Sequence, residues 1–560
     1  MRKLFLLLVL SLYCSKVLSQ ISLETETAID SIFSHYQNKP GCAIAIVKDG
    51  VTLFKKAYGL ANLAFDVPIN SHTVFDVASD AKQFTAACIF LLEQEGKLKL
   101  DDPIQKYLPE FPVYDGDPIT IRNLLHHTSG LRSYLSTLYS KNLYWGDSFD
   151  NSDALKILIR HKDLNFPTGT RFYYSNSNYA LLASIVKKAS GVSLGRYARQ
   201  KLFVPLGMTS TFFKQERDTV VKNIATGYES AGDYFKQLHY YNAHVIGDGG
   251  LHTNLEDFVR WSNNFRNGTV GGDELIKSMM SSGSLANGDK IAYAGGLYNE
   301  RYRNMKDFPA IGHSGAWAGF RSLFYKFLDQ DLAFIILSNN ADTNVWVLLD
   351  QLMPLFLEDE MQKAQSEAMG RVEQNMGETI KLTRAEMSRF CGEYYNTITG
   401  VLRAIEMQGD TIFYKRSDGR ATPLIPMDSN TLTFEGAPFV KLTFNDSAYQ
   451  SMVFTVNDQD PAPFKKYDKR TYSEAELKEF ENKYYSEDID EVHEIVALKT
   501  GLKVLARGKE LVHLEPFTKD AFRAEHFGYI VFYRDDNKGK VTGFTRYDDH
   551  LYNLKFELQQ

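Results

Sequence analysis

The last third of this chain contains an internal repeat, which strongly constrains the fold because two copies of one unit adopt one structure. Thr383-Arg384-Ala385-Glu386 and Tyr394-Tyr395 recur, at an offset of 90 residues, as Ser473-Glu474-Ala475-Glu476 and Tyr484-Tyr485. Each copy opens with a short helical pattern and continues with alternating apolar residues between turns. The repeat therefore predicts two small antiparallel β-domains, each a barrel or a curled sheet.

The whole chain, at 560 residues, is too long for one hydrophobic core. Ahead of the repeat it alternates helical and extended patterns, and a polar stretch at 366–381 suits a linker. Strands are predicted at 42–47, 52–57, 74–77, 320–325 and 332–337, and helices at 83–95, 179–190 and 345–365. The chain is predicted to divide into an amino-terminal segment (1–19), a mixed helix-and-strand domain (20–365), the first β-domain (366–470) and the second β-domain (471–560).

The first 19 residues have the composition of a secretory signal. Arg2-Lys3 forms the positively charged region, residues 4–12 form the apolar region, and Val17-Leu18-Ser19, which ends in a small residue, precedes the expected cleavage site. That run is too short to span a bilayer, and no later stretch is long and apolar enough. The chain is therefore expected to be secreted or periplasmic, without a membrane span. A lipid anchor on Cys14 is a weaker alternative, because bulky Tyr13 precedes it.

Charge and cysteine content exclude several classes of protein. The formal net charge is −6, and −9 without the first 19 residues, which excludes a nucleic-acid binder driven by charge. The remaining cysteines, Cys42, Cys88 and Cys391, are odd in number and lie apart in apolar contexts. They are interpreted as buried small hydrophobes rather than a disulfide framework or a metal site.

Three short polar patterns occur in one order: Ser79-Asp80-Ala81-Lys82, Tyr174-Ser175-Asn176 and His313-Ser314-Gly315. Together they supply a nucleophile, a base, a second proton carrier and an oxyanion-binding strand, which acyl transfer through a serine ester requires. Each pattern alone is weak, since Ser184-Ile185-Val186-Lys187 also has the first spacing. Context must choose between the copies.

Context favours Ser79, which follows an extended segment and opens an apolar-periodic helix. A helix start offers unpaired N–H groups and a positive local field beside a developing oxyanion. Lys82 lies one turn further on the same face, where a buried amine can lose its proton and act as a base. Ser184 lies inside an amphipathic helix, where its hydroxyl is expected to bond back to the backbone. Asp80 is interpreted as a first-turn acid stabilised by the helix dipole.

Two other motifs are decoys. Lys499-Thr500-Gly501 has a pattern found in penicillin-recognising enzymes, but it lies where the first repeat has the turn Gln408-Gly409-Asp410. A hairpin turn is the better explanation. The adjacent His126 and His127 invite a metal interpretation, but no carboxylate or Cys completes a ligand set. A structural role at the following turn is preferred, and neither a metal nor a cofactor is expected.

The neighbours of the three patterns resemble the serine β-lactamase-related family. The resemblance covers about residues 27–355 and is carried by these segments: Gly59-Leu60-Ala61-Asn62, Phe75 to Ala86, Leu124 to Leu131, Pro205-Leu206-Gly207-Met208, Tyr174-Ser175-Asn176, Gly247 to Leu251 and His313-Ser314-Gly315. This group includes class C β-lactamases, D-alanyl-D-alanine carboxypeptidases, D-aminopeptidases and esterases. The resemblance implies an α+β catalytic domain, an antiparallel sheet packed with helices plus a helical subdomain, with the site between them.

The resemblance also assigns roles. Tyr174, deprotonated or hydrogen-bonded beside Lys82, would carry a proton from Ser79 to the leaving group. Asn176 would orient Lys82 and the substrate carbonyl. Residues 313–316 would form an edge strand, in which Gly315 admits the substrate and the Ala316 N–H completes the oxyanion hole with that of Ser79.

His313 departs from the Lys that many penicillin-recognising enzymes carry. A mostly neutral His weakens the binding of a substrate carboxylate, which favours esters, amides or peptides with a free amino end over β-lactams. Arg321 and Arg171 are two candidates to restore carboxylate binding.

The sequence thus predicts an exported serine hydrolase that needs no cofactor. Its partners would be small-molecule or short-peptide substrates: cell-wall D-amino-acid peptides, D-aminoacyl amides or small esters. One alternative is a penicillin-binding protein or β-lactamase that is acylated by β-lactams. Another is a non-catalytic cell-surface module in which the repeats carry the function.

Overall fold

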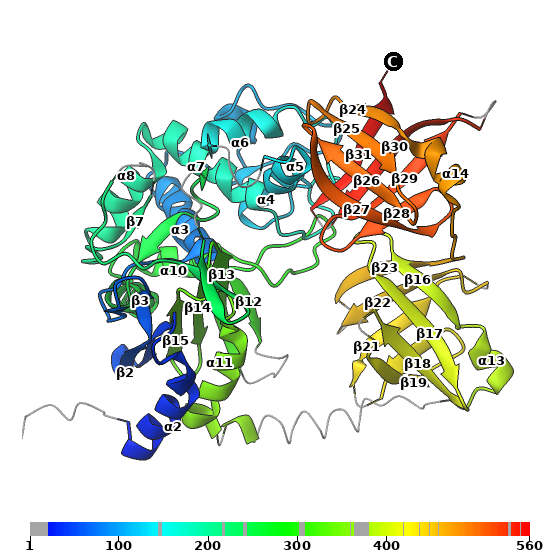
Figure 1. Cartoon of the computed structure of the whole chain (residues 1–560). Coiled ribbons are helices and arrows are strands. Elements are labelled where there is room, and N and C mark those ends of the chain that lie inside the picture. The colour runs from blue at the N-terminus through cyan, green and yellow to red at the C-terminus, as the bar shows by residue number, and fades with distance from the viewer. Residues whose placement is uncertain are drawn as a thin grey trace, which may run out of the picture.

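The computed structural model describes residues 21–143, 148–214, 219–238, 243–301, 308–358, 360–362, 380–417, 419–435, 437–446, 448–456, 459–535, 539–548 and 550–559. The expected signal segment lies outside the described residues, as does the predicted linker apart from residues 380 and 381. Three bodies follow one another along the chain: an α+β domain and two closed β-barrels (Figure 1).

The α+β domain is built on a six-stranded antiparallel sheet of order β12-β13-β14-β15-β1-β2. Its strands are β1 (Cys42–Lys48), β2 (Val51–Tyr58), β12 (Tyr298–Arg301), β13 (Pro309–Trp317), β14 (Phe320–Phe327) and β15 (Leu332–Ser338). The short strands are β3 (Leu60–Asn62), β4 (Val67–Pro68), β5 (Phe75–Asp76), β6 (Phe149–Asp150), β7 (Phe212–Phe213), β8 (Tyr228–Ala231), β9 (Tyr234–Gln237), β10 (Ala243–His244) and β11 (Leu251–Thr253). The predicted strand at 74–77 is the shorter β5, because the backbone turns at Ala78.

Helices cover both faces of this sheet. They are α2 (Leu23–Phe33), α3 (Ala81–Gln94), α4 (Ile121–Leu125), α5 (Tyr134–Ser140), α6 (Asn151–Leu158), α7 (Asn176–Ser190), α8 (Leu194–Ala198), α9 (Leu255–Asn267), α10 (Gly272–Met280) and α11 (Val345–Leu352), with short turns η1 (Ser34–Tyr36), η2 (Ala78–Asp80), η3 (Ile104–Lys106) and η4 (Arg199–Phe203). The predicted helix 345–365 is interrupted, since α11 ends at Leu352 and, after a turn at Met353, residues 354–358 and 360–362 are again helical.

Side chains alternate along β1 between two apolar cores, as a strand buried on both faces requires. Ile44 and Ile46 belong to the core that includes residues of α2 and α11. Ala43 and Ala45 belong to the core that includes residues of α3, α7 and α9. The second core continues into the helical subdomain, where α7 packs on α3, α4 and α6. This packing places the start of α3 between the sheet and the subdomain.

Each repeat forms a closed eight-stranded antiparallel barrel. The first contains α13 (Arg384–Ser388), β16 (Gly392–Asn396), β17 (Leu402–Gln408), β18 (Thr411–Arg416), β19 (Ala421–Pro426), β20 (Thr431–Phe434), β21 (Ala437–Phe444), β22 (Ser451–Val456) and β23 (Gln459–Tyr467). The second contains α14 (Glu474–Leu477), η6 (Lys478–Phe480), β24 (Asn482–Ser486), β25 (Glu491–Ala497), β26 (Leu502–Ala506), β27 (Lys509–Thr518), β28 (Ala521–Ala524), β29 (Gly528–Arg534), β30 (Val541–Asp548) and β31 (Leu551–Leu558).

The two barrels share equivalent hydrogen bonds at the positions where their sequences repeat. Thr383 and Ser473 each cap a short helix and form a capping box with a Glu three residues later. The hydroxyl of Tyr394 donates to the carbonyl of Phe390 at 2.8 Å, and that of Tyr484 to the carbonyl of Phe480 at 2.9 Å. Each barrel therefore begins with a capped helix that is tied to its first strand.

The interpretations of Ser184, of residues 499–501 and of Cys42 and Cys88 are confirmed. The hydroxyl of Ser184 donates back to the carbonyl of Ala180 at 3.4 Å, as expected inside a helix. Residues 499–501 lie in the turn between β25 and β26, the counterpart of the turn between β17 and β18. Cys42, Cys88 and Cys391 are free, and the first two are buried. Within the described residues, no group of three or more potential ligands is placed to hold a metal, and no helix is long and apolar enough to cross a bilayer.

Candidate active site

Ser79 lies in a turn that the protein holds in an uncommon backbone conformation. The preceding residue, Ala78, has a φ of 47°, in the left-handed region that costs a residue with a Cβ about 1 kcal/mol or more. Its N–H donates to Asp76 Oδ1 at 2.8 Å, and the N–H of Val77 donates to the carbonyl of Leu251 at 3.0 Å. Ser79 itself is partly exposed, in η2 just ahead of α3.

Lys82, in the first turn of α3, is fully buried with three acceptors around its amine. Nζ lies 3.1 Å from Ser79 Oγ, 2.8 Å from Asn176 Oδ1 and 2.6 Å from the carbonyl oxygen of Asp248. A neutral amine has two protons and one lone pair. It can donate to the two shorter partners and still accept the hydroxyl proton of Ser79.

The electrostatics of Lys82 favour that neutral form. Burial lowers the pKa of Lys82 to about 7; the nearby carboxyl groups of Asp248 and Asp80 act in the opposite direction only when they are ionised. Near neutral pH a substantial fraction of the amine is therefore unprotonated. A group of this kind is a suitable general base.

Tyr174 reaches the same point from the segment before α7. Its phenol is hydrogen-bonded to Ser79, and its ring centroid lies 4.9 Å from Lys82 Nζ. Burial raises the pKa of Tyr174 well above its usual value, so the phenol is protonated at neutral pH. Of the two states considered from the sequence, the structure favours the hydrogen-bonded phenol over the phenolate.

His127 packs against the ring of this phenol. Its ring centroid lies 4.5 Å from that of Tyr174. Nδ1 accepts hydrogen bonds from the Ser175 N–H at 3.2 Å and from Asn178 Nδ2 at 2.9 Å. Burial holds the pKa of His127 well below its usual range, so the ring is neutral. His127 thus fixes the chain on both sides of Asn176, the first residue of α7.

His313 lies on β13 and is neutral as well. It is 3% exposed, and burial beside Lys82 lowers its pKa to about 3. Nδ1 donates to the carbonyl of Ser314 at 2.7 Å. The prediction of an edge strand needs correction, because β12 lies outside β13. However, β12 pairs only with residues 309–312, so the segment that contains His313 extends beyond it.

Gly315 has a packing function that the sequence did not predict. A Cβ at this position would overlap the carbonyl oxygen of Val77 and the hydroxyl of Ser322. The glycine therefore lets β13 pack against the turn that carries Ser79, rather than simply admitting substrate. Ala316, the next residue, borders the same cavity as Ser79.

Asp80 lies at the start of α3 and is fully buried. Ser322 Oγ lies 2.5 Å from Asp80 Oδ2 and 2.8 Å from the carbonyl oxygen of Val77. A hydroxyl has one proton, so both contacts can be hydrogen bonds only when the Asp80 carboxyl supplies the other. Burial raises the pKa of Asp80 well above its usual value, in agreement with a protonated carboxyl.

Two residues of the site have no catalytic pattern of their own in the sequence. Asp248 accepts from Lys82 through its carbonyl and from the Tyr134 hydroxyl, at 2.8 Å, through Oδ2. Asp248 lies in the glycine-rich segment 247–251, which was noted only as part of the family resemblance. Tyr134, the first residue of α5, belongs to no motif of the sequence that indicated a catalytic function.

Two cavities meet at this cluster. One, of about 480 Å³, is bordered by Ser79, Asn176 and Ala316 and by apolar side chains that include Phe149, Trp317 and Phe320. The other, of about 630 Å³, is bordered by Tyr174 and Asn176 on one side and by residues of both barrels on the other. Arg321 and Arg171 border neither cavity. The barrels therefore form part of the surroundings of the site.

Comparison with known proteins identifies the family. The sequence profile described as Beta-lactamase matches residues 29–351, more than half of the chain. The chain is 30% identical over 318 residues to penicillin-binding protein 4* of Bacillus subtilis (strain 168), across 53% of this chain and 68% of that protein. It is 28% identical over 315 residues to the D-aminopeptidase of Brucella ovis (strain ATCC 25840 / 63/290 / NCTC 10512), across 56% of this chain and 59% of that protein.

Solved structures agree on the fold. The penicillin-binding protein homologue of Pyrococcus abyssi superposes with a TM-score of 0.52 at 22% identity, over 79% of this chain and 99% of that one. The D-amino acid amidase of Ochrobactrum anthropi SV3 superposes with a TM-score of 0.50 at 21% identity, over 60% of this chain and 99% of that one. The chain belongs to the beta-lactamase family and is related to its serine hydrolases.

Proposed function

We propose that this protein is an exported serine hydrolase that acts on D-amino-acid peptides, D-aminoacyl amides or small esters through a serine acyl-enzyme. One observation carries the proposal: the buried amine of Lys82 lies 3.1 Å from Ser79 Oγ and has a pKa lowered to about 7. A nucleophile and a base are thus in contact, with the base in its working state near neutral pH.

The reaction begins when Ser79 Oγ attacks the substrate carbonyl carbon and Lys82 takes the hydroxyl proton. The tetrahedral oxyanion accepts hydrogen bonds from the N–H groups of Ser79 and Ala316. The proton then passes to the leaving amine or alcohol by way of the Tyr174 phenol, which is hydrogen-bonded to Ser79. The carbon–leaving-group bond breaks and an ester on Ser79 remains. A water molecule, deprotonated by the same base, hydrolyses that ester and frees the enzyme.

The lining of the cavity beside Ser79 supports neutral or amino-terminal substrates. His313 is uncharged, and among the described residues that line this cavity Lys214 is the single Lys or Arg. The remaining lining combines apolar side chains, such as Phe149, Trp317 and Phe320, with polar ones that include Asp76 and Asp248. Such a pocket binds an apolar acyl group more readily than a carboxylate. A relative named D-aminopeptidase is consistent with this preference.

Export to the periplasm or the medium is the second part of the proposal, and it rests on residues 1–19. Amino-terminal sequencing of protein recovered from the periplasmic or extracellular fraction should begin at Gln20. Recovery of the protein only inside the cell, with Met1 retained, would contradict export.

Labelling and turnover separate the candidate functions. A fluorescent phosphonate should label the wild type at Ser79 and fail to label Ser79→Ala. A nitrophenyl ester and D-alanyl nitroanilide should then be hydrolysed faster than a chromogenic cephalosporin. Stable acylation by the cephalosporin without turnover would indicate a penicillin-binding protein. No labelling of the folded wild type would indicate a non-catalytic module.

A further inference from the structure

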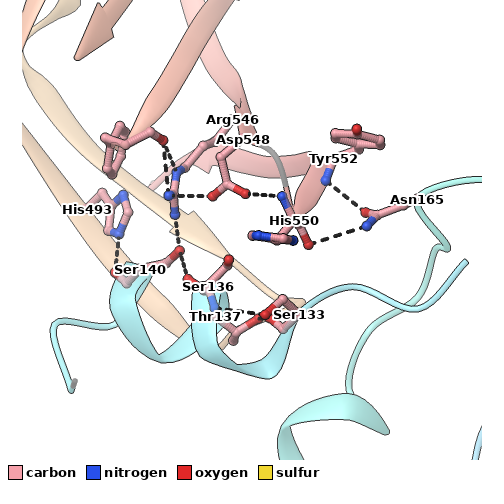
Figure 2. A network of polar contacts seen from close by, with 11 residues as sticks. Ser133, Ser136, Thr137, Ser140, Asn165, His493, Arg546, Asp548, His550 and Tyr552 are labelled. Carbon is pink, nitrogen blue, oxygen red and sulfur yellow. Dashed lines mark hydrogen bonds and ion pairs between the residues drawn. The ribbon is translucent and has the colours of Figure 1, made fainter. Parts of the chain in front are cut away.

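The second barrel holds helix α5 at both ends (Figure 2). At the start of the helix, the N–H of Ser133 donates to the carbonyl of His550 at 2.9 Å. At its end, Ser140 receives two hydrogen bonds. Its hydroxyl accepts from Arg546 Nη1, and its carbonyl accepts from His493 Nε2 at 2.8 Å. These partners come from β25, from β30 and from the turn after β30.

On the barrel side of this contact, Arg546 is buried and held by neighbouring residues of the barrel. Arg546 is 1% exposed, and its guanidinium lies 3.9 Å from the ring centroid of Phe527. Nη2 donates to Asp548 Oδ2 at 2.7 Å, and Asp548 Oδ1 accepts from the N–H of His550 at 2.7 Å. A chain of hydrogen bonds within the barrel thus connects Arg546, which contacts the end of α5, with His550, which contacts its start.

Residues that flank α5 extend the same contact. Arg132, fully buried, donates to Asp488 Oδ2 at 2.5 Å and to the carbonyl of Asn553 at 3.2 Å. Lys141 donates to the carbonyls of Ile489, at 2.5 Å, and Asp490, at 2.9 Å. The barrel therefore fixes the helix and the residues on both sides of it, rather than one side chain.

Helix α5 in turn touches the groups that hold Lys82. Tyr134, its first residue, donates through its hydroxyl to Asp248 Oδ2 at 2.8 Å. The N–H of Tyr134 donates to Ser177 Oγ at 2.9 Å, next to Asn176 in the first turn of α7. Asp248, through its carbonyl, and Asn176, through its amide oxygen, are the two closest partners of the amine.

We propose that the second barrel is a positioning device for the catalytic amine: by gripping α5 it keeps Asp248 and the start of α7 closed around Lys82 and excludes water. The inference rests on the serine hydrolase chemistry proposed above and adds Arg546 and Ser140 as positioning residues. It gives a barrel with no catalytic group of its own a function in the reaction.

A loosened α5 has a predictable effect on Lys82. The titratable groups that face this amine are Asp248, Asp80, Tyr174, Tyr179, His127 and His313. Burial is the largest cause of its low pKa, so water that enters beside α5 should raise that pKa from about 7 toward its ordinary value. A rise of one pH unit leaves about five times less neutral amine at pH 7.

The experiment measures the rate of Ser79 labelling by a fluorescent phosphonate between pH 5 and 10, which needs no knowledge of the natural substrate. Ser140→Ala and Arg546→Met should each move the midpoint up by about one pH unit and lower the rate at pH 7 about fivefold. Arg546→Lys, which keeps a cation at this position, should show a smaller shift of the midpoint than Arg546→Met. The matched control is Arg534→Met, since Arg534 contacts Asp520 and Glu479 inside the same barrel.

The outcomes are distinct. A wild type that is not labelled contradicts the serine hydrolase proposal itself. A labelled wild type with unchanged midpoints in folded Ser140→Ala and Arg546→Met, even with lower melting temperatures, reduces the contact to a structural interface and overturns the inference. An equal shift in Arg534→Met also overturns it. Should Arg546→Met fail to fold, Ser140→Ala, which removes one hydroxyl, decides alone.

Discussion

Asn176 and Lys82, 94 positions apart in the sequence, are joined by a hydrogen bond of 2.8 Å between the amine and the amide oxygen. The amide holds the amine without adding a charge that would keep it protonated. Asn176→Asp should therefore raise the pKa of Lys82, because a carboxylate at contact distance shifts such a group by about one to three units. Phosphonate labelling at pH 7 should fall at least fivefold, about the effect of one unit, and recover near pH 9.

Asn176→Ala is the matched variant for this change, because it removes the hydrogen bond without adding charge. Its labelling rate should fall at every pH, without recovery in alkali. Equal pH profiles for the two variants would mean that the amide does not set the charge state of Lys82.

The pH profile of the wild type tests which group is the base. Lys82 has a pKa of about 7 and acts as a base only when unprotonated, so the labelling rate should rise with pH through a midpoint near 7. Burial raises the pKa of Tyr174 well above its usual value, so a phenolate base would instead give a rise above pH 10. Lys82→Met should abolish labelling, and a midpoint above 10 in the wild type would assign the base to Tyr174.

The sequence predicted the contact of Ser79 and Lys82 because their spacing at one helix start is a local property, whereas the family resemblance placed Tyr174 beside them. It could not predict how Asp248 and Tyr134 complete the site. Asp248 contacts Lys82 through its backbone carbonyl, and any residue type has that group. Tyr134 acts through a helix whose position depends on a barrel more than 340 residues away in sequence, as the contact between Ser140 and His493 shows.

The fold was predictable to a similar depth. The two β-domains could be predicted because the repeat and the alternation of apolar residues are visible within each unit of the sequence. The docking of the second barrel on α5 did not, since it depends on isolated polar residues such as Arg546 that carry no periodic signal. The close packing of Gly315 against the Val77 carbonyl was not predicted, because a glycine pattern does not say which atoms come close.

Asp80 should be replaceable by its neutral isostere. In Asp80→Asn, Nδ2 can donate to Ser322 Oγ while Oδ1 still accepts from Gln83 Nε2, a contact of 3.3 Å in the wild type. The melting temperature and the labelling rate at pH 7 should stay close to those of the wild type. Asp80→Ala leaves buried polar groups unpaired, which costs about 1–3 kcal/mol for each group. A loss in Asp80→Asn as large as in Asp80→Ala would show that the carboxyl is ionised.

Gly315 and Gly249 offer a matched test of how tightly β13 packs on the nucleophile turn. A Cβ on Gly315 would overlap the Val77 carbonyl and the Ser322 hydroxyl, so Gly315→Ala must displace β13 or the backbone that carries Ser79. On Gly249 the nearest atom would be the Ala78 carbonyl oxygen at 3.8 Å, an ordinary contact. Gly315→Ala should lower the labelling rate at least tenfold, a barrier increase of about 1.4 kcal/mol or more, whereas Gly249→Ala should stay within about twofold. Equal rates in the two variants would show that the site tolerates movement of β13, and that its geometry is set by α3 and α7 alone.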